Sequence, residues 1–161
     1  MTVTLGYLCD HPDAAPVLAR WHWQEWAAII PGWSEAEALA ELRTHTRRRH
    51  LPTTIVAYAG AELVGSASLL AEDMPDFPPL TPWLASVFVL PDRRGQGLGE
   101  ALARRVLEEA AALGHARVYL FTTHQAGWYA RMGWRVQQAF ASGGEPGVIM
   151  ATDTARHRAS F

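Results

Sequence analysis

Cysteine is nearly absent from this sequence: Cys9 is the only one among 161 residues. A single thiol excludes internal disulfides and a zinc site built from several thiolates. The sequence also lacks a basic N-terminal region followed by an apolar run, and no apolar run reaches the roughly 20 residues that span a bilayer. The formal net charge of −2 gives no reason to expect a nucleic acid or an acidic membrane surface as a partner. Together these absences predict a soluble, cytoplasmic protein.

Internal repeats, low-complexity segments and long linkers are absent as well. The 161 residues, 49% of them hydrophobic, are enough for one domain with a sizeable core. We therefore expect a single domain over residues 1–155 and a loose C-terminal tail over residues 156–161.

The most informative stretch runs from an apolar segment through a glycine-rich turn into an amphipathic segment. Residues 83–90 are rich in β-branched and aromatic side chains and have the length of a buried strand. Residues 98–113 place leucine, valine and alanine on one helical stripe. Gly95, Gly97 and Gly99 lie at the junction of the two elements. Free N–H groups and the positive end of a helix converge at such a turn, so the pattern predicts an anion site.

Two well-known anion loops do not match this turn. A dinucleotide loop needs a glycine at the sixth position of Gly-x-Gly-x-x-Gly, and Glu100 stands there. A nucleoside triphosphatase loop needs Gly-Lys-Ser/Thr, which the sequence lacks. The turn instead reads Arg94-x-x-Gly97-x-Gly99 behind Val-x-Val-Leu-Pro-Asp. That pattern resembles the acyl-CoA pyrophosphate loop of the GCN5-related N-acetyltransferases.

A second motif of the same family lies downstream. Tyr129, three further residues and then Gly133-Trp134 resemble the acetyltransferase pattern of a tyrosine followed by a Gly-aromatic pair. The spacing from the glycine loop leaves room for one helix, one strand and the short helix that carries the tyrosine. The order of elements and both motifs agree over most of the chain, which is identified as a member of this family.

Local patterns predict the remaining elements. Ser34 begins a helix with a capping box, and Gly60-Ala61 joins two strands of a hairpin. The basic stretch at residues 43–50 is interpreted as the solvated C-terminal end of the helix that Ser34 begins. In chain order we expect strand 2–9, helices 11–30 and 34–50, strands 53–59 and 62–70, loop 71–82, strand 117–121, helix 122–133, and strands 134–140 and 147–151.

The first of these helices is rich in tryptophan. Trp23, Trp26 and Ile30 share a helical face, whereas Trp21 points almost in the opposite direction. Two interpretations stay open for these side chains. They pack in the core, or one of them lines the pocket of an acceptor substrate.

The family resemblance implies the fold. This is an α/β (α+β), single-domain acyl-CoA N-acyltransferase fold, in which about four helices flank a mixed, mostly antiparallel twisted sheet of about seven strands. The strands at 84–90 and 117–121 would lie side by side and splay apart. The pantetheine arm of acetyl-CoA, the expected co-substrate, would enter that opening, and no metal is implied.

The resemblance also assigns roles by position. Backbone groups of Val87, Phe88 and Val89 would bind the pantetheine arm and the thioester carbonyl, and Tyr129 would sit near the sulfur. Amides of the glycine loop would hold the pyrophosphate. These belong to Arg94, Gly95, Gln96, Gly97, Leu98 and Gly99.

The implied reaction is direct transfer of the acetyl group of acetyl-CoA to a primary amine. A neutral amine attacks the thioester carbonyl, a strand N–H stabilises the charge on the carbonyl oxygen, and a phenol protonates the departing thiolate. Tyr129 is the expected acid, and the alternative is a core tyrosine beside Trp128 and Trp134. A small amine, an antibiotic, a polyamine, a lysine side chain and a protein N-terminus all meet this chemistry.

One departure from the family pattern concerns the base. Many members carry a glutamate on the central strand near Ala85 or Ser86, and neither residue is a carboxylate. Asp73 is the expected substitute, acting through water, because it follows a strand that should pack near the central one. The other candidates are Glu72, Asp76 and His124. The missing glutamate also leaves open a second class of function, a catalytically silent acyl-CoA-binding module that senses the cofactor or serves a partner.

Overall fold

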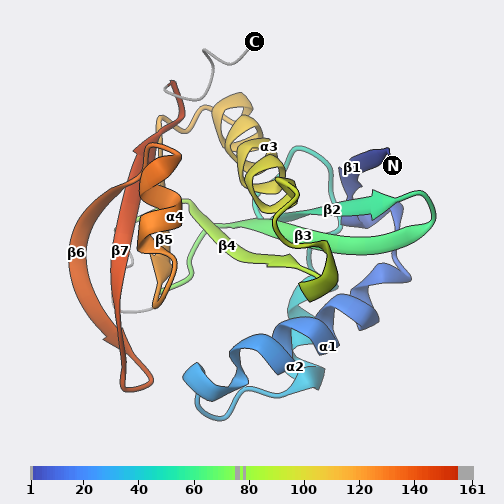
Figure 1. Cartoon of the computed structure of the whole chain (residues 1–161), viewed down its shortest axis with the longest axis horizontal. Coiled ribbons are helices and arrows are strands. Elements are labelled where there is room, and N and C mark those ends of the chain that lie inside the picture. The colour runs from blue at the N-terminus through green and yellow to red at the C-terminus, as the bar shows by residue number, and fades with distance from the viewer. Residues whose placement is uncertain (1, 75–76, 78, 156–161) are drawn as a thin grey trace.

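Seven strands and four α-helices make up the part of the chain that the computed structural model describes, residues 2–74, 77 and 79–155. Figure 1 shows them in chain order: β1 (Val3–Tyr7), α1 (Ala14–Trp26), α2 (Glu35–Leu42), β2 (Thr53–Ala59), β3 (Glu62–Leu70), β4 (Trp83–Val89), α3 (Leu98–Ala112), β5 (Arg117–Thr122), α4 (Ala126–Arg131), β6 (Arg135–Ser142) and β7 (Glu145–Asp153). The predicted tail at residues 156–161 and the candidate base Asp76 lie outside the described residues. No helix within the described ranges has the length and apolar character needed to cross a membrane.

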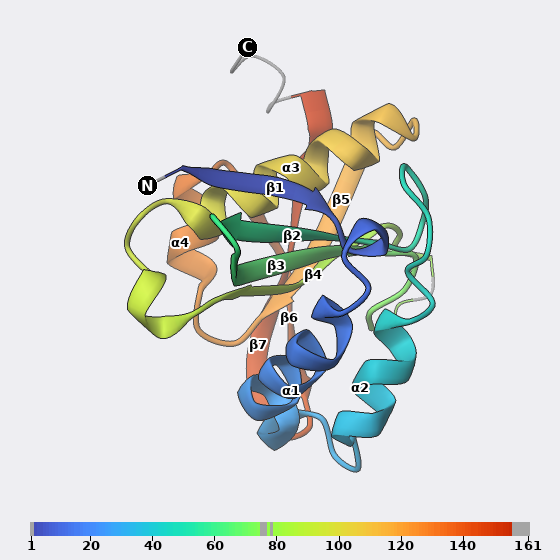
Figure 2. The same cartoon turned by 90° about the vertical axis from the view of Figure 1, so that its right-hand side faces the viewer.

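The strands of the described chain join one sheet in the order β1-β2-β3-β4-β5-β7-β6. Neighbouring strands run antiparallel, except that β4 and β5 are parallel. Helices α1 and α2 lie on one side of the sheet, and α3 and α4 lie on the other (Figure 1 and Figure 2). This arrangement confirms the mixed, mostly antiparallel fold that the sequence motifs implied.

The core forms a layer on each face of the sheet. On one face the predicted apolar stripe of α3 is buried against β2, β3 and β4, with Leu102, Val106 and Leu107 at its centre. On the other face Leu18 of α1 and Leu42 of α2 are buried together with Val56 of β2. Each helix hides one apolar stripe, and this burial provides most of the stability of an amphipathic helix in a protein.

Strand β4 contains a bulge. Ser66 of β3 faces Phe88, but Ser68 faces Ala85, so β4 has one extra residue between these two pairs. Ser86 lies within the bulge and has a φ of 55°, a left-handed conformation that few residues other than glycine adopt. A bulge bends its strand and increases the local twist. The strand therefore changes direction at Ser86.

Strands β4 and β5 stay together only at one end. Trp83 is the only β4 residue in register with β5 among the described residues, and its partner is Tyr119. The backbone N–H of Tyr119 also donates to the carbonyl oxygen of Pro82 at 3.0 Å. Beyond this point the strands diverge (Figure 1), so the backbone of residues 87–89 is not covered by β5.

Two buried histidines join the layer of α1 and α2 to the sheet. His22 Nε2 lies 3.0 Å from Ser66 Oγ, and His45 Nδ1 lies 2.6 Å from Thr54 Oγ1. Burial lowers the pKa of each imidazole to about 4, and the nearby His45 adds to the effect on His22. Both rings are therefore neutral at physiological pH. The contact of His22 with Ser66 fixes the orientation of α1 about its own axis. Glu25 and Trp26 follow one helical turn later and therefore lie on the same side of the helix as His22.

Helix α2 is shorter than predicted. It ends at Leu42, so the basic residues interpreted as its solvated end lie beyond the helix. Arg48 pairs with Asp10 at 2.7 Å, and Arg49 pairs with Glu109 of α3 at 3.2 Å. These arginines are exposed, as predicted, but their placement on the helix was wrong. Ion pairs with residues far along the chain hold the segment, and a local pattern does not reveal such partners.

Glu109 is a fully buried carboxylate on α3. The hydroxyl of Tyr7 donates to its Oε1, and Arg105 Nη1 lies 2.6 Å from the same oxygen. Arg49 Nε lies 3.2 Å from the second oxygen, Oε2. A buried charge is tolerated only when it is paired and hydrogen-bonded. The cluster therefore joins α3 to β1 and to the segment that follows α2.

Replacing Glu109 with alanine should lower the free energy of unfolding by about 1–3 kcal/mol, because Tyr7, Arg49 and Arg105 lose a shared charged partner. Urea denaturation followed by circular dichroism measures the loss. Glu108→Ala is the matched control, since Glu108 is the exposed neighbour on the same helix, and it should change stability by less than about 0.5 kcal/mol. Equal losses in the two variants would contradict this role for Glu109.

Candidate active site

The divergence of β4 from β5 leaves a cavity of about 400 Å³. Its walls come from α1, from β4 and the turn after it, from the start of α3 and from α4. The lining residues are Glu25, Trp26, Val87, Phe88, Val89, Arg93, Arg94, Gly95, Gly97, Leu98, Gly99, Glu100, Gln125, Trp128 and Tyr129. The cavity thus brings together Tyr129 and every predicted CoA-binding residue except Gln96.

The turn between β4 and α3 has the geometry of an anion site. Gly95 and Gly97 have φ values of 80° and 81°, which L-residues with a Cβ rarely adopt. No side chain caps α3, so the first N–H groups of this 15-residue helix keep their donors for a ligand. A Cβ at either glycine would meet nothing within 4 Å, which leaves the face of the loop open. These features fit a diphosphate group.

Gly99 sets the distance between α3 and α4. A Cβ at this position would lie 3.1 Å from the ring of Trp128, closer than an ordinary van der Waals contact. The absence of a side chain lets the Trp128 ring approach the start of α3. Trp128 then forms the wall between the anion loop and the tyrosine that follows it in α4.

Tyr129 is buried on α4 but still lines the cavity. Its ring packs edge-on against Trp128 and Trp134, with centroids 4.8 and 5.9 Å away. Burial raises the pKa of the Tyr129 phenol, so the phenol stays protonated at neutral pH. Tyr129 thus belongs to a tryptophan cluster and also lines the cavity, and its role as an acid stays a prediction.

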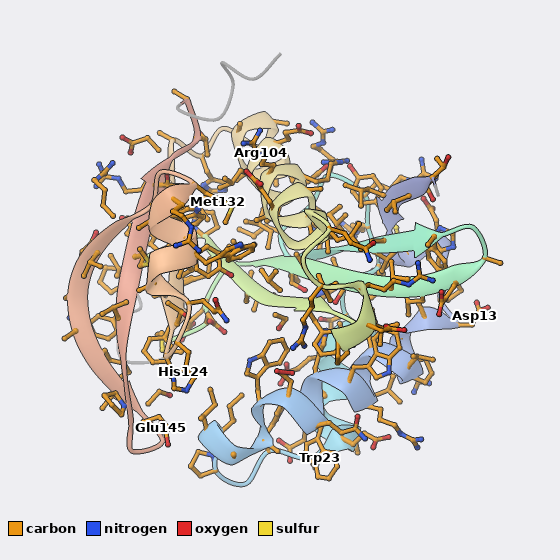
Figure 3. All side chains as sticks on the ribbon, in the orientation of Figure 1. Asp13, Trp23, Arg104, His124, Met132 and Glu145 are labelled. Atoms are coloured by element: carbon orange, nitrogen blue, oxygen red, sulfur yellow. The ribbon has the colours of Figure 1, made fainter. Side chains whose placement is uncertain are left out.

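Phe88 connects β4 to α1. Trp21 stacks on the Phe88 ring at 5.5 Å, and Trp26 meets it edge-on at 6.3 Å. The predicted grouping of Trp23 with Trp26 was wrong. Trp23 lies on the side of α1 away from the sheet (Figure 3) and donates its Nε1–H to the carbonyl oxygen of Trp33 at 3.2 Å. The Phe88 ring contacts both Trp21 and Trp26. The spacing of residues along α1 alone does not reveal a partner on another strand.

The predicted bases lie apart from the cavity lining. Asp73 is half-buried on the segment after β3, and burial, with a smaller effect from the charge of Glu41, raises the pKa of its carboxyl to about 6. Glu72 is exposed, and His124 is exposed in the turn between β5 and α4 (Figure 3). Within the described parts of the chain, no three His, Cys, Asp or Glu side chains gather closely enough to hold a metal ion.

Glu25 is one of several cavity residues that the sequence motifs missed, with Arg93 and Glu100 among the others. It lies on α1, and its Oε2 is 3.7 Å from Arg94 Nη2 of the anion loop. A sequence signal for it exists in the composition of α1. Glu25 is a single carboxylate between Trp21 and Trp26, on a helix whose aromatic residues suggested an acceptor pocket. Gln125 and Trp128, which flank the tyrosine motif, were also missed.

A family model describes this chain. Residues 16–134 match the model of the acetyltransferase (GNAT) family, which covers more than half of the sequence and includes both motifs. The chain belongs to this acetyltransferase family. The resemblance inferred from the glycine loop and the tyrosine motif is therefore confirmed.

Solved structures share the fold of this family member. An aminoglycoside 6′-N-acetyltransferase in complex with coenzyme A is 18% identical over 96% of this chain and 97% of that chain, with a TM-score of 0.69. A putative acetyltransferase from Salmonella typhimurium with its cofactor acetyl-CoA is 19% identical over 96% and 95%, with a TM-score of 0.72. Spermidine N-acetyltransferase from Vibrio cholerae, in complex with CoA and spermine, is 15% identical over 97% and 98%, with a TM-score of 0.71. At these identities the likeness is one of fold.

Gly97→Glu should abolish the binding of coenzyme A, because the variant adds bulk and negative charge where the diphosphate is expected. Isothermal calorimetry measures the affinity. Gly114→Glu is the control, since Gly114 also has a left-handed φ, 89°, with nothing within 4 Å of a Cβ, but lies at the far end of α3. Equal affinities in the two folded variants would refute the assignment of the loop.

Proposed function

We propose that this member of the acetyltransferase family transfers the acetyl group of acetyl-CoA to a primary amine. The observation that carries the proposal is the single cavity that joins an open anion loop, the uncovered backbone of β4 and the Tyr129 phenol. The diphosphate of the donor needs the anion loop, and its thioester arm needs the uncovered backbone. The departing thiolate needs the phenol. A cytoplasmic location remains a prediction.

Donor binding follows from the walls of the cavity. The diphosphate of acetyl-CoA binds the amides of residues 94–99 at the positive end of α3. The pantetheine arm lies along Val87, Phe88 and Val89, whose backbone β5 does not cover. A backbone N–H of this segment then stabilises the negative charge that develops on the thioester carbonyl oxygen.

The proposed chemistry balances as an acyl transfer. The amine nitrogen forms a bond to the carbonyl carbon, the carbon–sulfur bond breaks, and the nitrogen releases a proton to a base. The departing thiolate takes a proton from the Tyr129 phenol, which solvent later restores. Because its pKa is raised, the phenol carries its proton at neutral pH, although the same shift makes it a weaker acid.

Two of the structural neighbours support an amine as the acceptor class. One is a spermidine N-acetyltransferase with spermine, and another is an aminoglycoside 6′-N-acetyltransferase. These substrates belong to those proteins, and what carries over is the shared nucleophile, a primary amine.

Thiol release tests the proposal directly. The protein is mixed with acetyl-CoA and a panel of alkylamines, aromatic amines, polyamines and lysine peptides, and free thiol is followed with a chromogenic disulfide. Mass spectrometry of the products then identifies the acetylated nitrogen. Release that requires both protein and amine supports the transferase. Tight binding of acetyl-CoA without release for any amine would favour a silent acyl-CoA-binding module instead.

Tyr129→Phe should lower kcat by about 10²–10⁴-fold while the affinity for coenzyme A stays unchanged, because the hydroxyl acts only as the thiolate leaves. Single-turnover kinetics measure the chemical step. Tyr58→Phe removes a hydroxyl from β2, outside the cavity lining, and serves as the control. Full activity of Tyr129→Phe in single turnovers would leave this residue with a packing role alone.

Asp73 is proposed as the base, and because it lies apart from the cavity lining, the proton of the amine would reach it through water. Because its carboxyl pKa is raised to about 6, it becomes a carboxylate as the pH rises through 6, and kcat/KM should rise in the same range. The rise near pH 6 should be lost in Asp73→Asn. A rise that survives in Asp73→Asn but disappears in His124→Ala would assign the base to His124 and contradict this role for Asp73.

A further inference from the structure

Among the described residues, Glu25 is the only carboxylate that α1 contributes to the cavity lining. It shares that lining with Tyr129 and with Val87, Phe88 and Val89. Its side chain is 38% exposed, so the carboxylate is accessible to a ligand in the cavity. Buried His22, one turn earlier on α1, anchors this part of the helix to β3. Glu25 therefore projects from a fixed helix and not from a loop.

Arg94 connects Glu25 to the anion loop. Its Nε donates to the carbonyl oxygen of Val89 at 2.9 Å, and its guanidinium lies 5.7 Å from the centre of the Phe88 ring. The remaining end of the guanidinium faces Glu25 at 3.7 Å. The side chain of Arg94 is thus folded back from the loop toward α1.

The pair of Glu25 and Arg94 differs from the other ion pairs at the cavity. Arg93 pairs with Glu62, and Glu100 pairs with Arg104 at 2.9 Å, and in each case the partner lies outside the lining. Within the described residues, Glu25 with Arg94 is the only ion pair of which both members line the cavity. At 3.7 Å, with side chains 38% and 51% exposed, it is a weak contact that a stronger ligand can replace.

Building on the proposed function, we propose that Glu25 binds the ammonium group of the acceptor once the diphosphate of the donor has taken over Arg94. A guanidinium forms short, bidentate hydrogen bonds with phosphate oxygens, which are stronger than its long contact with Glu25. The exchange leaves a carboxylate without its cation beside the thioester path. An incoming ammonium supplies the missing charge, and the face of Trp26 adds cation–π attraction. The bound ammonium then loses its proton to the base, and the neutral amine attacks the thioester.

This exchange defines a class of acceptor. The ammonium is carried on an apolar or aromatic body that suits the ring of Trp26. An amine that also carries a carboxylate is disfavoured, because Glu25 repels it. The same exchange couples the two substrates: the donor raises the affinity for the ammonium, and the ammonium raises the affinity for the donor by the same factor.

The first test measures the binding of coenzyme A by calorimetry to wild type, Glu25→Gln and Glu35→Gln. Glu25→Gln should bind about two- to five-fold more tightly, because a competitor for Arg94 is gone. This difference in affinity between Glu25→Gln and wild type should disappear at high salt. Glu35 pairs with Arg20 at 3.6 Å and is 42% exposed, so Glu35→Gln removes a similar ion pair away from the cavity and should leave the affinity unchanged.

The second test uses 2-phenylethylamine as the acceptor and compares steady-state constants. Glu25→Gln should raise KM for this amine by about 10- to 100-fold, with a much smaller effect on kcat, because a charged hydrogen-bond partner is lost. Glu25→Asp, which keeps the charge, should restore part of the affinity. Asp73→Asn should instead change the pH profile of kcat/KM.

The outcomes separate this inference from the proposed function. A wild-type protein that binds no coenzyme A would refute the proposed function itself. In another outcome, the wild type binds coenzyme A and acetylates 2-phenylethylamine while Glu25→Gln has the same affinity for coenzyme A and the same KM for the amine. That result would refute only the role of Glu25. A wild type that acetylates glutamate in preference to 2-phenylethylamine would overturn the acceptor class.

Discussion

The bulge at Ser86 bends β4 away from β5, and the cavity exists because of this bend. A continuous ladder between the two strands would consume the backbone groups of residues 87–89 in sheet hydrogen bonds. The divergence leaves those groups available to a ligand, at the cost of the pairing that a sheet normally provides. Helix α4, with Tyr129, closes one side of the opening, and α1, with Glu25, closes another. The functional groups come from distant parts of the chain but share this one gap.

Typical interaction energies indicate that the proposed anion loop would bind through several contacts together. A helix end contributes only about 0.3–1 kcal/mol to the binding of a negative charge at a surface. Useful affinity for a nucleotide-like donor therefore needs several amides, the charge of Arg94 and the apolar wall formed by Val89 and Trp128. Arg94 is engaged in two further contacts before a ligand arrives, with the Val89 carbonyl and the Phe88 ring. Its side chain is thus the element of the loop best placed to respond to the donor.

The features predictable from sequence are those whose signal lies within one element or one turn. The glycine spacing, the stripe of α3 and the position of Tyr129 before Gly133 are local, and the structure has the helices and the loop where the patterns indicated. The bulge at Ser86 left no local signal, since the strand sequence is regularly apolar. The partner of Arg49 is Glu109, sixty positions along the chain. Glu25 was missed for the same reason, because its place in the cavity follows from how α1 packs on Phe88.

Hydrogen exchange measured by mass spectrometry, with and without acetyl-CoA, tests most directly the claim that this gap is the donor site. We expect slower exchange at the amides of residues 87–89 and 94–99 when acetyl-CoA is present, and little change in β1 and β2 at the other end of the sheet. Protection that is absent from both segments, or that concentrates away from the gap, would contradict that claim.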